Sequence, residues 1–86
     1  MAKDQGKPRI SSEQMRAARG LLRWEQKDLA RESKVSLPTI TRLELTPGPI
    51  GGWDRTAEAI RAAFETAGIE FLEANGSGEG VRFRKS

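Results

Sequence analysis

The chain contains no cysteine and no histidine among its 86 residues. Without cysteine it forms no disulfide, and without either residue type it cannot build a Cys/His zinc site. The lack of histidine also excludes nucleophilic triads that depend on an imidazole base. We therefore expect no metal and no other cofactor, and we expect that the protein is not an enzyme.

Long apolar runs are missing as well. No stretch approaches the roughly 18–20 apolar residues of a membrane-spanning helix, and the first residues lack the apolar segment of a signal peptide. We therefore expect a cytoplasmic protein without a membrane partner. Its 86 residues are enough for one domain with one modest core.

Charge is unevenly distributed along the chain, although the net charge is only +3. Residues 1–24 carry six basic and two acidic side chains, a net +4, whereas residues 45–80 carry two basic and six acidic side chains, a net −4. The last six residues add three basic side chains. This polarity suits a molecule with one face turned toward phosphates and another face turned away.

Apolar residues at helical spacing predict a first helix from about Ser12 to Leu22. Ser11 followed by Gln14 fits a capping box, in which each side chain satisfies the other residue's free backbone amide. The apolar face of this helix is formed by Met15, Ala18, Leu21 and Leu22.

Two shorter helices follow, separated by the segment Lys34-Val35-Ser36. The first of them is predicted from Gln26 to Ser33. The other begins after Ser36, whose hydroxyl can cap it, and Pro38 lies in its first turn, where a missing N–H costs nothing. The residues that face inward on the two helices are Leu29, Ala30, Ile40 and Leu43.

A loop, a fourth helix and a hairpin complete the chain. Residues 46–52 hold two prolines and three glycines, which predicts a loop. The fourth helix is expected from about Trp53 to Ala67, with Gly68 as the glycine that ends it. Its apolar stripe consists of Trp53, Ala57, Ile60, Phe64 and Ala67. Residues 69–86 are expected to form a β-hairpin.

Residues 16–44 are the most informative part of the chain. Two short helices joined by a three-residue turn, the second exposing small polar groups, are typical of a helix-turn-helix. Ala30 must be small because the following helix crosses closely over it, and Val35 must be apolar to help fix the angle between the helices. Only a rigid pair projects the outer face of its second helix into a DNA major groove about 12 Å wide.

Three motifs in this region resemble the Xre family, the bacterial and phage repressors of the lambda type. They are R-x-x-R-G-L-L from Arg16, Q-x-x-L-A from Gln26, and V-S-x-x-T-I-x-R-L-E ending at Glu44; the resemblance covers about residues 12–67. It implies a mainly α fold, a lambda-repressor-like helical bundle, here of about four helices containing the helix-turn-helix and followed by the C-terminal β-hairpin.

The expected organisation has three parts: a flexible arm over residues 1–10, a DNA-binding domain over residues 11–68, and a hairpin over residues 69–86 that serves as a dimerisation element. Two interpretations of the arm remain open. It is either a terminus without a function or an arm that reaches into a neighbouring groove of the DNA. The basic residues available for that contact are Lys3, Lys7 and Arg9.

The resemblance also implies which residues contact double-stranded DNA. Gln26 and Ser36 would bind phosphates, Gln26 with its amide at a helix N-terminus. Arg42 is the best candidate for a bidentate contact to guanine O6 and N7. Thr41 is expected either to read a base or to bind the DNA backbone. The base-reading surface would consist of Leu37, Pro38, Thr39, Thr41 and Arg42.

The chain departs from the family pattern at two positions. Lys34 stands where the family usually has glycine, because that residue has a positive φ angle, and lysine there should cost about 1 kcal/mol. Its ammonium either approaches DNA phosphates or belongs to a merely strained surface lysine. Pro38 has no amide hydrogen to donate, so readout would rest on Arg42, the threonines and DNA shape.

The family pattern also suggests that Arg19 and Glu44 form an internal ion pair between the first helix and the end of the third. Arg16 is expected either at a phosphate or on a solvated face. We interpret Trp24 and Trp53 as anchors of helix packing, in preference to stacking platforms for single-stranded nucleic acid. A solvated surface is expected for the acidic residues Asp54, Glu58 and Glu65.

The hairpin is where we expect the partner subunit. It carries more apolar surface than a lone two-stranded sheet can hide. The residues of the expected dimer interface are Ile69, Phe71, Leu72, Val81 and Phe83. Pairing of one strand edge across a two-fold axis would hold two recognition helices about one DNA turn apart. The alternative is a hairpin that folds back on its own helical core.

Together these features predict a small homodimeric transcriptional regulator, a repressor or autoregulator. It would be associated with the nucleoid and would bind an inverted repeat in double-stranded DNA. An alternative is an antitoxin or adaptor that controls its own promoter and also neutralises a partner protein. The short C-terminal segment argues against the alternative, because it is too short to wrap around a toxin.

Overall fold

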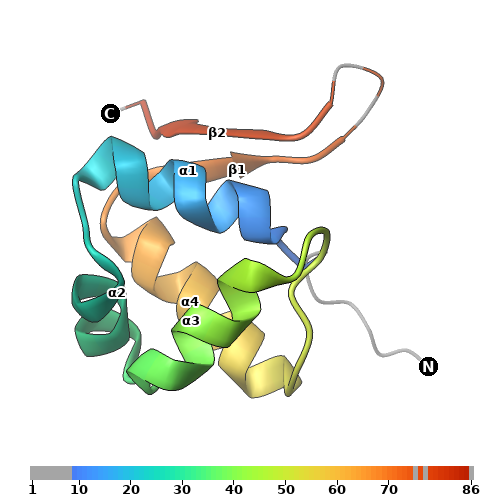
Figure 1. Ribbon diagram of the computed structural model, residues 1–86. Coiled ribbons are helices and arrows are strands. Elements are labelled where there is room, and N and C mark those ends of the chain that lie inside the picture. The colour runs from blue at the N-terminus through green and yellow to red at the C-terminus, as the bar shows by residue number, and fades with distance from the viewer. Residues whose placement is uncertain (1–8, 75, 77, 86) are drawn as a thin grey trace.

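The computed structural model of this protein describes residues 9–74, 76 and 78–85. The elements are α1 (Ser12–Leu22), α2 (Gln26–Ser33), α3 (Leu37–Leu45), α4 (Asp54–Thr66), β1 (Ile69–Leu72) and β2 (Gly80–Phe83). Four helices followed by an antiparallel hairpin confirm the predicted fold class (Figure 1). In the described part of the chain, no helix has the length and apolar character needed to cross a membrane.

Local sequence signals determine where the helices begin and end. The Ser11 hydroxyl accepts a hydrogen bond from the Gln14 amide at 3.0 Å, and the Ser11 amide donates to Gln14 Oε1 at 2.9 Å. The predicted capping box is therefore confirmed. Gly68, with φ 103°, follows the C-terminal end of α4 as expected.

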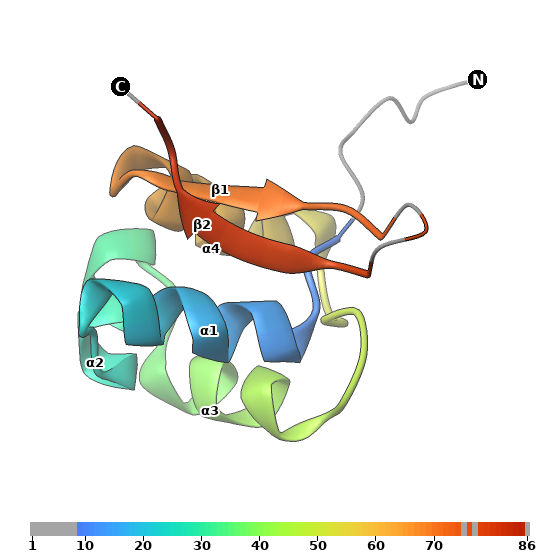
Figure 2. The same ribbon diagram turned by 90° about the horizontal axis from the view of Figure 1, so that it is seen from above.

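The hairpin covers one side of the helices. β2 lies over α1 and β1 lies over α4, whereas α3 lies on the other side of α1 (Figure 2). In the sheet, Ile69 stands opposite Phe83 and Phe71 stands opposite Val81, so these four side chains share one face. That face is turned toward the helices, because Ile69 and Phe71 are buried.

One apolar core joins the helices, the loop before α4 and the hairpin. Phe64 is fully buried in it, stacks on Trp24 with ring centroids 5.8 Å apart, and meets Phe71 edge-on, also at 5.8 Å. Leu21, which we expected on the apolar face of α1, is 39% exposed, because that face ends at Ala18 and Leu22. The buried apolar residues are Ile10, Met15, Ala18, Leu29, Ile40, Leu43, Ile50, Ala57, Ile60, Ala63, Phe64, Ile69 and Phe71.

Two residues of the expected flexible arm over residues 1–10 belong to the fold, and residues 1–8 lie outside the described residues. Ile10 is only 2% exposed and is part of the core, and its carbonyl accepts a hydrogen bond from the Ile50 amide at 3.0 Å. Arg9 donates to the Ile50 carbonyl at 3.0 Å and forms an ion pair with Asp54. Arg9 is therefore occupied within the fold. The other two basic residues of the arm, Lys3 and Lys7, lie outside the described residues.

Candidate nucleic-acid interface

The turn between α2 and α3 consists of Lys34, Val35 and Ser36. Lys34 follows α2 in the left-handed conformation, with φ 65°, and its amide donates to the Ala30 carbonyl at 2.9 Å. The predicted positive φ at this position is confirmed. Ser36 then caps α3, because its hydroxyl accepts from the Thr39 amide at 3.4 Å. Pro38 lies in the first turn of α3, as expected.

The inner side of α3 holds the helix in place. Ile40 is fully buried and Leu43 is 4% exposed, and both contact a core that includes Leu29 of α2. Ala30 and Val35 are partly buried against the same core. The predicted inward residues of α2 and α3 therefore lock the two helices at a fixed angle.

The outer side of α3 is exposed. Most of the residues predicted to read bases lie on it: Leu37, Pro38, Thr41 and Arg42. Thr39 is half-buried, and its hydroxyl accepts a hydrogen bond from Ser36 at 2.9 Å. Ser36 and Lys34, the predicted phosphate contacts at the N-terminal end of this surface, are exposed. The structure therefore brings the predicted α3 residues together on one accessible face.

The predicted ion pair between Arg19 and Glu44 is present. Arg19 Nε lies 2.7 Å from Glu44 Oε2 and Arg19 Nη2 lies 2.8 Å from Oε1. These hydrogen bonds to the carboxylate raise the pKa of Arg19 above its ordinary value. The Glu44 side chain is only 4% exposed, so the pair fixes the end of α3 to α1 from within.

Gln26, at the start of α2, lies between this ion pair and the surface of α3. Its Nε2 donates to Glu44 Oε1 at 3.1 Å, and its Oε1 accepts from the Thr41 hydroxyl at 2.7 Å. Gln26, which we predicted to bind a phosphate, is therefore half-buried, and its side chain is already hydrogen-bonded to Glu44 and to Thr41. The sequence carries no local signal for this arrangement, since Gln26 and Thr41 lie on different helices.

Arg16 makes a contact that neither of its two expected interpretations included. Its Nη1 donates to the main-chain oxygen of Glu44 at 2.7 Å. This carbonyl belongs to the last turn of α3, where helix carbonyls lack intrahelical partners. Arg16 and Arg19 are three residues apart and lie on one face of α1. Given the expected Arg19–Glu44 pair, that spacing is the signal that could have placed Arg16 near the same end of α3.

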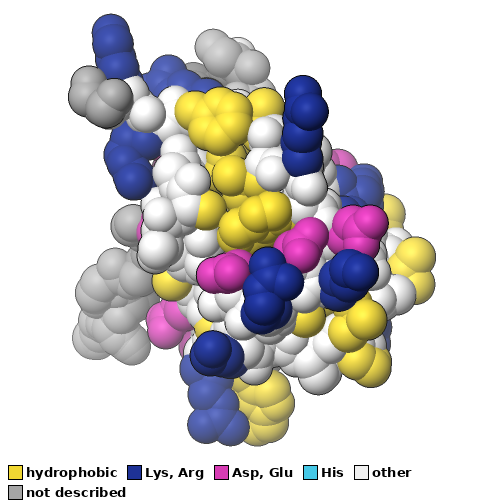
Figure 3. All heavy atoms as spheres, turned by 90° about the vertical axis from the view of Figure 1, so that its left-hand side faces the viewer, with side chains coloured by type: hydrophobic (Ala, Val, Ile, Leu, Met, Phe, Trp, Pro, Cys, Tyr) yellow, Lys and Arg dark blue, Asp and Glu magenta, His cyan; other side chains and the backbone are white. Residues whose placement is uncertain are grey.

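The outer face of α2 is electrostatically mixed, unlike that of α3. Asp28 pairs with Arg31 at 3.1 Å, Arg31 with Glu32 at 3.3 Å, and Lys27 with Glu25 at 3.4 Å. On the side of the molecule where α2 lies, basic and acidic side chains alternate (Figure 3). Because its cations are paired with anions, this face is a poor match for a row of phosphates.

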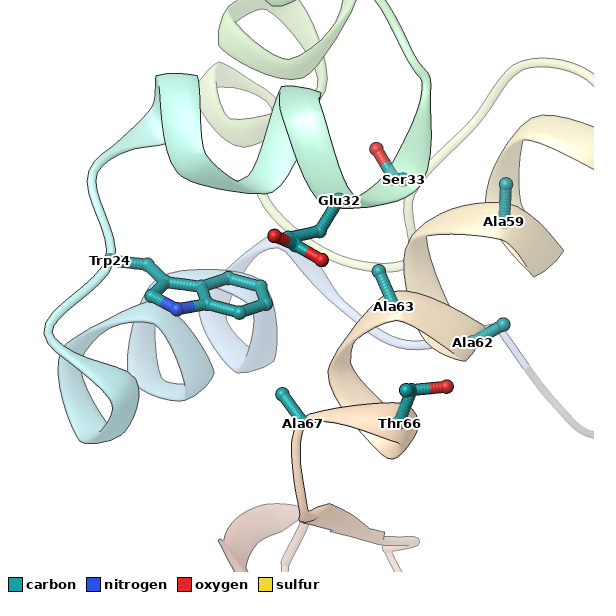
Figure 4. A pocket seen from close by; sticks show the side chains of 8 residues that line it. All are labelled: Trp24, Glu32, Ser33, Ala59, Ala62, Ala63, Thr66 and Ala67. Carbon is teal, nitrogen blue, oxygen red and sulfur yellow. The ribbon is translucent and has the colours of Figure 1, made fainter.

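A hollow of about 530 Å³ lies between α2 and α4, so it is separate from the outer face of α3 (Figure 4). The Trp24 ring borders it and stacks on Phe64, which agrees with its predicted function as a packing anchor. The same prediction is wrong for the second tryptophan, Trp53, which is not a packing anchor. Trp53 is 74% exposed at the N-cap of α4, with the Arg55 guanidinium 5.9 Å from its ring centroid. The hollow is lined by Trp24, Glu32, Ser33, Ala59, Ala62, Ala63, Thr66 and Ala67.

The hairpin packs on its own helical core, which is the alternative to the interface that we expected. Ile69 is fully buried and Phe71 is 8% exposed, so both side chains are used within the chain. Leu72 and Val81 are partly buried. Of the five predicted interface residues, Phe83 alone is largely exposed, at 53%. The physical reason for the correction is that Phe71 of β1 packs edge-on against Phe64 of α4, so the hairpin belongs to the same core as the helices.

Gln14 explains why the hairpin is fixed to α1. Its Nε2 donates to the carbonyls of Leu72 at 3.2 Å and Gly80 at 3.0 Å, one from each strand. The same side chain takes part in the capping box with Ser11. One glutamine therefore joins the start of α1 to both strands, a long-range function that its local sequence does not reveal.

Comparison with models of known protein families gives no match to this chain, and comparison with curated proteins gives none either.

Proposed function

We propose that this protein binds double-stranded DNA sequence-specifically through the outer face of α3 and acts as a small transcriptional regulator without enzymatic activity. The observation that carries the proposal is the two-sided character of α3. Its inner side is clamped by the core and by the Arg19–Glu44 pair, while Thr41 and Arg42 on its outer side are exposed. A rigid helix that presents polar side chains is what readout in a major groove requires.

We further propose that the protein acts as a homodimer on an inverted repeat. Phe83 is compatible with this, because it is 53% exposed and a second subunit at the edge of β2 could cover it. β2 is also an edge strand of a two-stranded sheet, and edge strands offer unpaired backbone groups to a partner. A symmetric pair would place two copies of α3 on successive turns of the duplex.

Selection of bound sequences from random duplex DNA tests the proposal. The expected product is an inverted repeat whose half-sites lie about one helical turn apart. Sedimentation equilibrium of the same protein should give twice the chain mass. Affinity for the selected duplex should fall steeply with salt, because each neutralised phosphate releases counterions. Failure to bind any duplex in dilute buffer would overturn the proposed function.

A further inference from the structure

The orientation of the Gln26 amide follows from its neighbours. Both Glu44 oxygens accept hydrogen bonds from Arg19, at 2.7 and 2.8 Å, and Oε1 also lies 3.1 Å from Gln26 Nε2. A carboxylate paired with a guanidinium accepts hydrogen bonds and has none to donate. The NH₂ end of the amide must therefore face Glu44, and its carbonyl oxygen must face away from Glu44.

That orientation determines what the Thr41 hydroxyl can do. Thr41 Oγ1 lies 2.7 Å from Gln26 Oε1, which is an acceptor, so the hydroxyl must give its single hydrogen to Gln26. Only its lone pairs remain for a ligand. Since Thr41 is exposed on the outer face of α3, these lone pairs are accessible to a molecule that binds there.

We infer that Thr41 is a specificity-determining residue that accepts a hydrogen bond from a base amino group, N6 of adenine or N4 of cytosine, and does not bind phosphate. The inference rests on the proposed function. Phosphate oxygens only accept hydrogen bonds, so a hydroxyl that already donates to Gln26 has nothing to offer them. In the major groove the amino groups of adenine and cytosine are the donors.

Gln26 is left with a hydrogen-bond donor, whereas Thr41 is left with acceptors. One of its two amide N–H groups donates to Glu44, and the other has no acceptor among the described residues. A free N–H at the start of a helix suits a phosphate oxygen. The ion pair between Arg19 and Glu44 therefore sets the donor and acceptor pattern of the surface: a donor at Gln26 and an acceptor at Thr41.

Deletion of single amino groups from the DNA tests the inference. In the selected duplex each adenine is replaced in turn by purine, and each cytosine by 2-pyrimidinone, and affinities are measured for wild type and for Thr41→Val. At one position in each half-site the deletion should weaken wild type about two- to tenfold more than Thr41→Val, as expected for one neutral hydrogen bond. Thr41→Ser should keep this coupling. Thr66→Val, an equal change at an exposed threonine of α4, should keep it as well.

Two results would overturn the inference. One is the absence of coupling between Thr41 and every amino group of the half-site. The other is coupling between Thr41 and a phosphate, detected by replacing single phosphates with methylphosphonates. Gln26→Met frees the Thr41 hydroxyl to rotate, so it should reduce the amino-group coupling. A wild-type protein that binds no duplex at low salt would instead overturn the proposed function itself, and the inference with it.

Discussion

Arg19 holds Glu44 by two hydrogen bonds, at 2.7 and 2.8 Å, between the last turn of α1 and the last turn of α3. The Glu44 side chain is 4% exposed and the Arg19 side chain 19%. Removing one member of a charge pair that is this buried is strongly destabilising, because the remaining charge has neither water nor a partner around it. The pair therefore matters for the stability of the fold as well as for the position of α3.

Arg19→Met should lower the free energy of unfolding by about 3–5 kcal/mol, because it leaves the buried Glu44 carboxylate without its cation. Urea denaturation of wild type and variant measures the difference. Arg31→Met is the matched control, since Arg31 is paired with Asp28 but its side chain is 63% exposed. It should change stability by less than about 1 kcal/mol. Equal effects of the two substitutions would contradict a structural function of the inner pair.

Lys34→Gly should stabilise the protein by about 1 kcal/mol, because φ 65° is strained for lysine and free for glycine. If the Lys34 ammonium binds a phosphate, the same substitution should also weaken DNA binding and reduce the magnitude of the salt slope by about 0.9. Arg23→Gly is the conformational control, since Arg23 also has a positive φ, 59°. Arg23→Gly should increase the free energy of unfolding and leave DNA affinity and the salt slope unchanged. An unchanged salt slope for Lys34→Gly would leave Lys34 as a strained surface residue.

Asp28 should make α2 sensitive to acid. The backbone amide of Glu25 and then Arg31 hold the pKa of Asp28 below its ordinary value of 3.8. The unfolded chain therefore binds the proton more tightly, so the stabilisation is complete above that value and is lost as the pH falls through the folded pKa. Asp28→Asn keeps an acceptor for Glu25 but does not titrate. Urea midpoints measured from pH 7 to about pH 2.5 should fall less steeply below about pH 4 for the variant than for wild type.

Local signals predicted the helices well because the residues that cap them act within four positions. Ser11, Ser36 and Gly68 all stand at the ends that we expected. Tertiary contacts were less accessible to the sequence. The apolar stripe of α4 included Trp53, but a stripe cannot show that the helix begins one residue later and leaves that ring in solvent. Likewise, the apolar residues of the hairpin required a cover, and alternation alone does not tell whether the cover is a partner or the chain's own helices.

For the candidate site, as for the fold, the sequence predicted local features better than tertiary contacts. The positions that face outward on α3 follow from its helical period, and the Arg19–Glu44 pair follows from the family resemblance. The bond between Gln26 and Thr41 does not, because it depends on how closely the N-terminus of α2 approaches α3. Two helices can pack against each other at different angles, and the periodicity of their sequences does not determine the angle. The packing of residues such as Leu29 and Ile40 fixes it.

Phe83→Asp should convert the proposed dimer into a monomer without unfolding the chain. Phe83 is 53% exposed, so its replacement removes little of the core and should change the unfolding free energy by no more than about 0.5 kcal/mol. A carboxylate in an apolar interface, by contrast, is left desolvated without a partner. Trp53→Asp changes a 74% exposed aromatic residue elsewhere and should leave the mass doubled. A doubled mass for Phe83→Asp would show that subunits meet at another surface.

Arg42→Ala should relax specificity and leave binding to unrelated sequences largely intact. A bidentate contact from arginine to guanine contributes about 1–3 kcal/mol of discrimination, and Arg42 is exposed on the outer face of α3, where the proposed function places such a contact. Repeating the selection with the variant should therefore erase the preference for guanine at one position of each half-site. Gln26→Ala should instead weaken binding to all sequences, because it removes a phosphate contact that carries no sequence information, and it should reduce discrimination only at the base that Thr41 reads. Arg82→Ala removes an equal charge from the hairpin, where Arg82 pairs with Glu70 at 3.1 Å, and should preserve the selected sequence. An unaltered preference in Arg42→Ala would assign guanine readout to another residue.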